Sequence, residues 1–270
     1  MIKCLVSSFP YVSDSFDKYL GSMTSLGVKN VEFYACSPHC YLYDTNDERV
    51  QTLKQQFEKT GIKPVVFTPE QWDYQMSIAL GEEKVRNRSI EYYKKAIKVA
   101  SAIGFEYVSI IAGYGYLNGN RDEDYARFIS GIKELLKYAK ENGVKILLEN
   151  DNESCVSTVE ELDKAVKDVN DEDLGLLLDV CELKACDGCI KKAYEALGKY
   201  IKYVQFSDYK AQKGSRLLPG EGELNLSKMA SFLKESGYDG YVGVELRGYT
   251  YMGNAQEATV KAINWLKENF

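Results

Sequence analysis

The chain has 270 residues, of which 45% are hydrophobic and 27% are charged, a composition typical of a globular protein. Its 40 acidic and 34 basic residues give a net charge of -6, and the lysines and arginines are spread evenly. A nucleic-acid binder normally carries a clustered basic surface, so that class is excluded. No stretch approaches the roughly 18 apolar residues of a membrane span. The apolar run within residues 1–8 is too short for a secretory signal, so we expect no membrane partner and a cytoplasmic location.

The seven cysteines show no disulfide-framework spacing, so reduced thiols are expected. Cys186 and Cys189 have the C-x-x-C spacing and lie near Cys181 in sequence. A structural zinc site needs four ligands, and the only other thiol pair, Cys36 and Cys40, is far away along the chain. Incidental thiols are therefore a better interpretation than half of a zinc site.

One junction recurs along the chain: a helical pattern ends, a glycine follows, and a β-branched or aromatic run begins within a few residues. Glycine suits the left-handed position after a helix because it has no Cβ to clash. The junction glycines are Gly27, Gly61, Gly104, Gly143, Gly198 and Gly237. The runs that follow them, together with two further apolar runs, predict eight strands at residues 2–7, 31–34, 65–67, 107–111, 145–148, 174–180, 203–206 and 241–244.

The stretches between these strands carry helix signals. Thr68-Pro69-Glu70-Gln71 has Pro at a first helical position and Gln where a capping box requires it, which predicts a helix start there. Ser157 and Thr158 each precede a glutamate by three residues, a second capping-box pattern. Residues 87–102 place apolar side chains at helical spacing.

Alternating strands and helices imply parallel strands with right-handed crossovers. Eight units of about 34 residues favour closure into a single (β/α)8 TIM barrel, an α/β fold that fills residues 1-270 as one domain. The alternative is an open doubly wound sheet, but its phosphate-binding G-x-G-x-x-G after the first strand is missing.

Four consecutive predicted strands end on oxygen-bearing side chains, at the end of a barrel where active sites lie. Side chains alternate along a strand, so each of these residues shares a face with the residue two positions earlier. If those faces point inward, three carboxylates and one amide oxygen converge in a small volume. The four residues are Glu149, Asp179, Gln205 and Glu245.

Carboxylates packed into a partly buried mouth repel one another, and a divalent cation would remove that conflict. Ligation by oxygen alone favours Mg or Mn over zinc or copper. The alternative is that the acids form ion pairs, for which Arg216 and Arg247 are the candidate partners.

The chain resembles the xylose isomerase-like TIM barrels, a superfamily of sugar phosphate isomerases and epimerases. The likeness covers essentially the whole chain and is densest over residues 145–247. Leu147-Leu148-Glu149-Asn150 is similar to the family's L-x-E-N, and Asp179 to the acid that opens its D-x-x-H. Residues 203–210 are similar to its V-H-x-x-D segment, residues 218–223 to its L-P-G-x-G-x loop, and residues 240–245 to its last strand with a terminal glutamate.

The resemblance implies that Glu149 and Glu245 exchange a proton with the substrate carbon and, with Asp179 and Gln205, hold the metal. It also implies that Arg216 binds substrate, as an arginine of the ketose 3-epimerases does. Two positions depart from the family pattern. Gln205 stands where the metal-binding residue is usually histidine, and Glu182, a further substrate-binding candidate, replaces the histidine of D-x-x-H.

These observations predict a divalent-metal-dependent isomerase or epimerase that removes the α-proton of a keto-sugar, or a related polyol-derived carbonyl compound, through an enediolate. One alternative is a dehydratase of an inosose or 3-dehydroshikimate-like substrate. Another is a sugar-binding barrel that lost catalysis with its histidines. The expected partner is a small sugar or polyol. A homo-oligomer and a phosphorylated substrate both remain open.

Two further features could contribute to the mouth. The single histidine, His39, follows the second strand in a loop that could reach the mouth, although a lone loop histidine is more often exposed. Tyr114 and Tyr116, after the fourth strand, could stack on a sugar, although tyrosines more often cover a helix layer.

Overall fold

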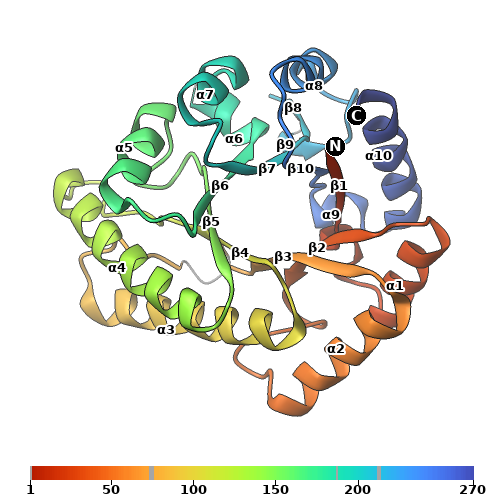
Figure 1. Ribbon diagram of the computed structural model, residues 1–270, viewed down its shortest axis with the longest axis horizontal. Helices are drawn as coiled ribbons and strands as arrows, with labels where there is room; N and C mark the ends of the chain where they lie inside the picture. Colours follow the sequence, from red (N-terminus) through yellow and green to blue (C-terminus); the bar gives the residue numbers. More distant parts are fainter. Residues whose placement is uncertain (1, 73–75, 187, 212–213) are drawn as a thin grey trace.

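A computed structural model of the protein describes residues 2–72, 76–186, 188–211 and 214–270. Eight parallel strands close into a barrel surrounded by helices, as Figure 1 shows. Going round the barrel, the strands are β1 (Lys3–Ser7), β2 (Asn30–Ala35), β3 (Lys63–Pro69), β4 (Tyr107–Ile111), β5 (Lys145–Glu149), β6 (Leu174–Asp179), β7 (Ile201–Gln205) and β10 (Tyr241–Val244). The predicted (β/α)8 TIM barrel and its eight strands are confirmed.

The helices follow the strands in alternation and form the outer layer of the barrel in Figure 1. A short antiparallel pair, β8 (Asp208–Lys210) and β9 (Gly214–Leu217), leaves the barrel after β7. The helical segments are η1 (Phe9–Tyr11), α1 (Phe16–Ser25), α2 (Asp47–Thr60), α3 (Glu83–Ile103), α4 (Arg121–Glu141), α5 (Val159–Val169), α6 (Val180–Ala185), α7 (Ile190–Leu197), α8 (Leu226–Glu235), α9 (Gly248–Tyr251) and α10 (Ala255–Asn269). In the described part of the chain, no helix is both long and apolar enough to cross a membrane.

The junction glycines take the left-handed conformation with one exception. Gly27, Gly61, Gly104, Gly143 and Gly237 have φ values between 66° and 104°. Gly198 has φ -50°, so the expectation of a left-handed exit from α7 was wrong. The chain there makes another right-handed turn, in which Tyr200 N donates to Leu197 O. A Cβ at Gly198 would lie 2.7 Å from Tyr194 O, so close approach accounts for the glycine.

One predicted helix start was wrong and another was confirmed. The described chain continues as β3 through Pro69, and α3 begins only at Glu83. Barrel contacts prevail over the local helix signal, because Glu70 N donates to Ala35 O and extends the contact with β2. The capping box of α5 forms between Thr158 and Glu161 as predicted. The predicted helix at 87–102 lies within α3.

The interior of the barrel is filled by a separate apolar cluster, while a larger core lies between strands and helices. Space in the barrel is tight: a Cβ on Gly243 of β10 would lie 2.4 Å from the Tyr203 hydroxyl on β7. The interior cluster comprises Leu5, Val65, Val66, Tyr107, Leu147, Leu177, Tyr203 and Tyr241.

Candidate active site

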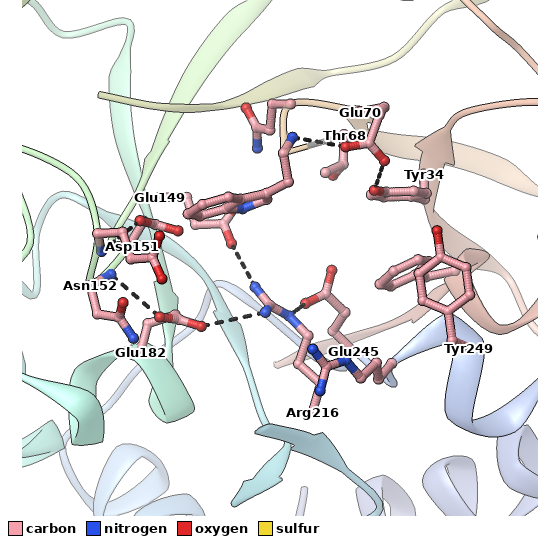
Figure 2. Close-up of a pocket in the computed structure, with 15 residues that line it drawn as sticks. Tyr34, Thr68, Glu70, Glu149, Asp151, Asn152, Glu182, Arg216, Glu245 and Tyr249 are labelled. Carbon is pink, nitrogen blue, oxygen red and sulfur yellow. Dashed lines mark hydrogen bonds and ion pairs between the residues drawn. The ribbon is translucent and has the colours of Figure 1, made fainter. Parts of the chain in front are cut away.

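A cavity of about 370 Å³ opens at the carboxyl ends of the barrel strands. Glu149, Glu182, Arg216 and Glu245 line it, and Figure 2 shows them grouped around its centre. Asp179 and Gln205 are fully buried at the ends of β6 and β7, which are neighbours in register. The structure therefore brings all six predicted site residues to the same end of the barrel.

Arg216 extends into the middle of this cavity from β9 (Figure 2). Its Nε donates a hydrogen bond to Glu245 Oε2. One terminal nitrogen lies 3.8 Å from Glu149 Oε1 and 3.7 Å from Asp179 Oδ2, and the other lies 3.4 Å from Glu182 Oε1. The ion-pair alternative thus applies to Arg216, which contacts all three acids of the predicted metal site.

The guanidinium separates the three acids. Among the described residues, no group of three or more His, Cys, Asp or Glu side chains is arranged to hold a metal as they stand. Two buried oxygens of the predicted set nevertheless have no hydrogen-bond partner: Asp179 Oδ2 and Gln205 Oε1. A buried oxygen that accepts no hydrogen bond is costly, and the acids around it can rearrange when a cation binds, so the site fits a cation.

Asp179 is held in place by the turn that follows it. Its Oδ1 caps α6 by accepting hydrogen bonds from the N–H groups of Cys181 (2.6 Å) and Glu182 (3.3 Å). Asn150 fixes its backbone, accepting from Asp179 N at 2.7 Å and donating to Asp179 O at 3.1 Å. The neighbouring residues Glu149 and Asn150 therefore have different roles. Glu149 lines the cavity, and Asn150 links the end of β5 to the end of β6 by hydrogen bonds.

Gln205 contacts an acid that the sequence analysis did not single out. Its Nε2 donates to both oxygens of Glu32, at 3.0 and 3.2 Å. Glu32 lies on β2 and is fully buried, where Thr68 Oγ1 and the Tyr203 hydroxyl also donate to it, each at 2.8 Å. The available signal was a charged residue inside the apolar run 31–34.

Burial raises the pKa values of the acids in this region, because it penalises the charged form. The pKa of Glu149 is raised well above its usual value, first by burial and then by the charge of Glu245. Burial also raises the pKa of Glu245 and Asp179, while Arg216 opposes both shifts. The pKa of Glu182 rises to about 7, chiefly through burial. Without a cation these acids do not all ionise easily at neutral pH.

The two walls of the cavity differ in chemistry. Asp151, Asn152 and Glu182 lie on one side in Figure 2, and Tyr34 and Tyr249 on the other. The ring of Phe9, another lining residue, stacks on Tyr34 with a centroid distance of 4.2 Å. An aromatic wall opposite a polar one suits a polyol, whose C–H face and hydroxyl groups need different partners.

His39 and the tyrosines after β4, the other candidates for the mouth, do not line the cavity, whereas the expected free thiols are confirmed. His39 is neither exposed nor at the mouth: it is buried beside Phe16, and its Nε2 lies 2.7 Å from Asp14 O. Tyr114 and Tyr116 are not among the described residues that line the cavity. The cysteines near the end of β6 are free thiols at different depths, buried for Cys181 and exposed for Cys189.

Comparison with known proteins places the chain in a family. Residues 22–269 match the model of the xylose isomerase-like TIM barrel family, and the protein belongs to it. Fructoselysine 3-epimerase of Shigella flexneri is 24% identical over 227 residues, which is 83% of this chain and 82% of that protein. Inosose dehydratase of Glaesserella parasuis serovar 5 is 29% identical over 167 residues, 54% of this chain and 56% of that protein.

Solved structures share the whole fold. A D-tagatose 3-epimerase-like protein superposes with a TM-score of 0.82 at 24% identity, covering 99% of this chain and 97% of its own. The IOLI protein, crystallised with a zinc atom, also superposes with a TM-score of 0.82. It is 23% identical and covers 100% of this chain and 99% of its own. The relatives include both epimerases and dehydratases.

Proposed function

We propose that the protein is a divalent-metal-dependent isomerase or epimerase acting on a keto-sugar or a related polyol-derived carbonyl compound. One observation carries the proposal: Glu149, Asp179 and Glu245 surround a single positive group at the mouth of the barrel. The relatives that are sugar 3-epimerases support the same class of reaction.

The donor chemistry fits a hard divalent cation. Glu149, Asp179, Gln205 and Glu245 offer only oxygen atoms, which favours Mn or Mg. Asp179 Oδ2 and Gln205 Oε1, which accept no hydrogen bond, are the atoms that such a cation would satisfy. Arg216 must then move away from the acids, and its guanidinium becomes available to a substrate oxygen.

The bound cation would stabilise negative charge that develops on the carbonyl and neighbouring hydroxyl oxygens of the substrate. Glu149 and Glu245 would transfer the proton, one removing it from the α-carbon and the other returning it. Ser109 Oγ donates to Glu149 Oε2 at 3.0 Å, which orients this carboxylate. Glu149 is the last residue of β5 and Glu245 directly follows β10, and because these strands are not adjacent the two acids can approach one carbon from different sides.

A dehydratase is the second candidate, and Glu182 favours it. This acid lines the cavity where epimerases of the family carry a histidine, and burial raises its pKa to about 7. A carboxyl group that keeps its proton near neutral pH can donate it to a departing β-hydroxyl. The inosose dehydratase relative supports this reading.

Proton exchange in D2O tests both candidates. Protein loaded with Mn²⁺ is incubated with a panel of ketoses, inososes and 3-dehydroshikimate, and spectra are recorded by ¹H NMR and ultraviolet absorbance. An epimerase introduces deuterium at the α-carbon and yields the epimer, whereas a dehydratase yields a more unsaturated product with a changed ultraviolet spectrum. A protein that binds these compounds without exchange or elimination would instead be a sugar-binding barrel, and the proposal would be wrong.

A further inference from the structure

Glu32 is a buried acid outside the proposed ligand set. Its carboxylate accepts hydrogen bonds from Thr68 on β3 and from Tyr203 and Gln205 on β7, so it joins three strands across the barrel interior. It is not among the described residues that line the cavity. A buried carboxylate is costly unless it is well hydrogen-bonded, and here every contact is with a donor.

The contact with Gln205 determines which way its amide faces. The oxygen and NH2 ends of an amide have almost the same shape, so packing alone distinguishes them poorly. Both oxygens of Glu32 accept from Gln205 Nε2, and this contact holds the amide in the orientation in which its NH2 end faces Glu32. Gln205 Oε1 is left on the other end of the amide, buried and without a hydrogen-bond partner.

We propose that Glu32 is a positioning residue for the metal site: it orients the Gln205 amide so that oxygen, and not NH2, is offered to the cation. This inference rests on the proposed metal-dependent function. An NH2 group cannot ligate a cation, so a Gln205 amide turned over would remove one of the four ligands. Partners of this kind typically change metal affinity about 10- to 100-fold when they are lost.

The test measures binding of Mn²⁺ alone to the full-length protein after chelator treatment, by calorimetry. Two variants disturb the contact that orients the Gln205 amide, each in a different way. Glu32→Gln keeps the shape, but its amide can donate as well as accept. Glu32→Asp keeps a carboxyl group but withdraws it by one methylene. Both are expected to bind Mn²⁺ about 10- to 100-fold more weakly than the wild type. Circular dichroism checks that each variant is folded, and either variant alone decides the outcome.

Two controls separate amide orientation from general damage. Thr68→Val removes another hydrogen bond to the same carboxylate and leaves Gln205 in contact with it, so Mn²⁺ affinity should stay close to wild type. The double variant Glu32→Gln with Gln205→Glu exchanges the two groups. A carboxylate has oxygens at both ends and needs no orientation, so this variant should regain most of the lost affinity.

The outcomes distinguish the two proposals. Wild-type affinity in either Glu32→Gln or Glu32→Asp would overturn the positioning role and leave the metal-dependent function standing. An equal loss of Mn²⁺ affinity in Thr68→Val would also overturn the positioning role, because the loss would then come from disturbed packing around Glu32. If the wild type binds no divalent cation, the proposed function fails first and the positioning role fails with it.

Discussion

Leu147 and Glu149 lie on the same face of β5, two residues apart, yet they belong to regions of opposite chemistry. Leu147 is part of the apolar cluster that fills the barrel, and Glu149 lines the cavity above it. On β6, Leu177 and Asp179 are also two residues apart: Leu177 belongs to the apolar cluster, and Asp179 is a buried acid. Along these strands, one region of the interior stabilises the fold by burying apolar surface, while the next gathers buried acids that cost stability and can carry chemistry.

The acids should have the largest effect on turnover. We expect Glu149→Gln and Glu245→Gln each to lower proton exchange at the substrate α-carbon by about 10²- to 10⁴-fold, because each removes a proton-transfer group. In the metal-free protein, Glu149→Gln should leave the unfolding free energy unchanged, because burial already disfavours the charged form of Glu149. Glu245→Gln should lower it, because Glu245 accepts the hydrogen bond that Arg216 Nε donates. NMR exchange rates and urea unfolding measure the two effects. Full turnover in both variants would refute the assignment.

Substitutions in the apolar region should affect stability and leave turnover nearly unchanged. We expect Leu177→Ala to lower the free energy of unfolding by about 2–5 kcal/mol, because it leaves a cavity among fully buried side chains. Turnover per folded molecule should change little, since Leu177 does not line the site. Urea unfolding and active-site-normalised rates measure these quantities. A loss of turnover without a loss of stability would erase the distinction between the regions.

Arg216 should stabilise the acidic region of the metal-free protein by pairing with its carboxyl groups. Arg216→Met leaves four carboxyl groups without their shared partner, and breaking a buried ion pair costs about 3 kcal/mol or more. We therefore expect lower stability of the metal-free variant. Mn²⁺ should bind it more tightly than wild type in the absence of substrate, because the guanidinium no longer competes. Unchanged Mn²⁺ affinity would mean that Arg216 does not occupy the cation position.

Metal should stabilise only through the acidic region. At 100 times its dissociation constant, Mn²⁺ should raise the unfolding free energy of the wild type by about 2.7 kcal/mol. At this same Mn²⁺ concentration, Leu177→Ala should gain the same unfolding free energy as the wild type, and Glu149→Gln should gain less. Thermal unfolding with Mn²⁺ and with excess chelator measures it. Equal increments in all three proteins would place the metal elsewhere.

The smallest effect concerns pH. Burial raises the pKa of Glu182 from 4.5 to about 7, so in this window the folded protein holds a proton that the unfolded chain has released. The stability that neutral Glu182 contributes is present below about pH 4.5 and is lost as the pH rises through 7. Glu182→Gln cannot ionise, so its stability relative to wild type should increase across this window in urea unfolding of metal-free protein. Parallel profiles would contradict the shifted pKa.

The barrel was predictable from sequence because its signals are local. A glycine after six of the helices and an apolar run after each of these glycines are properties of short segments, and the strands occur where these signals stand. The start of α3 was not predictable in this way. Thr68 and Pro69 carry a helix-start signal, but a hydrogen bond to Glu32 and the ladder beyond Ala35 keep them in β3.

The site was predictable in part for the same reason. Acids at strand ends must meet in a closed barrel, so their common location followed from the fold. Glu32 was missed because its role depends on Gln205, which is 173 residues away in sequence and meets it only inside the barrel. The central place of Arg216 depends on how the β8–β9 hairpin is set against the mouth, and no local pattern specifies that.

The tight space at Gly243 has a consequence for engineering. A methyl group there would collide with the Tyr203 hydroxyl, which would then no longer reach Glu32. A position without any functional group thus limits which sequences preserve the hydrogen bond between Tyr203 and Glu32. Mutant libraries that aim to change substrate range should keep residue 243 fixed and randomise Tyr34 and Tyr249, whose side chains line the cavity from its rim.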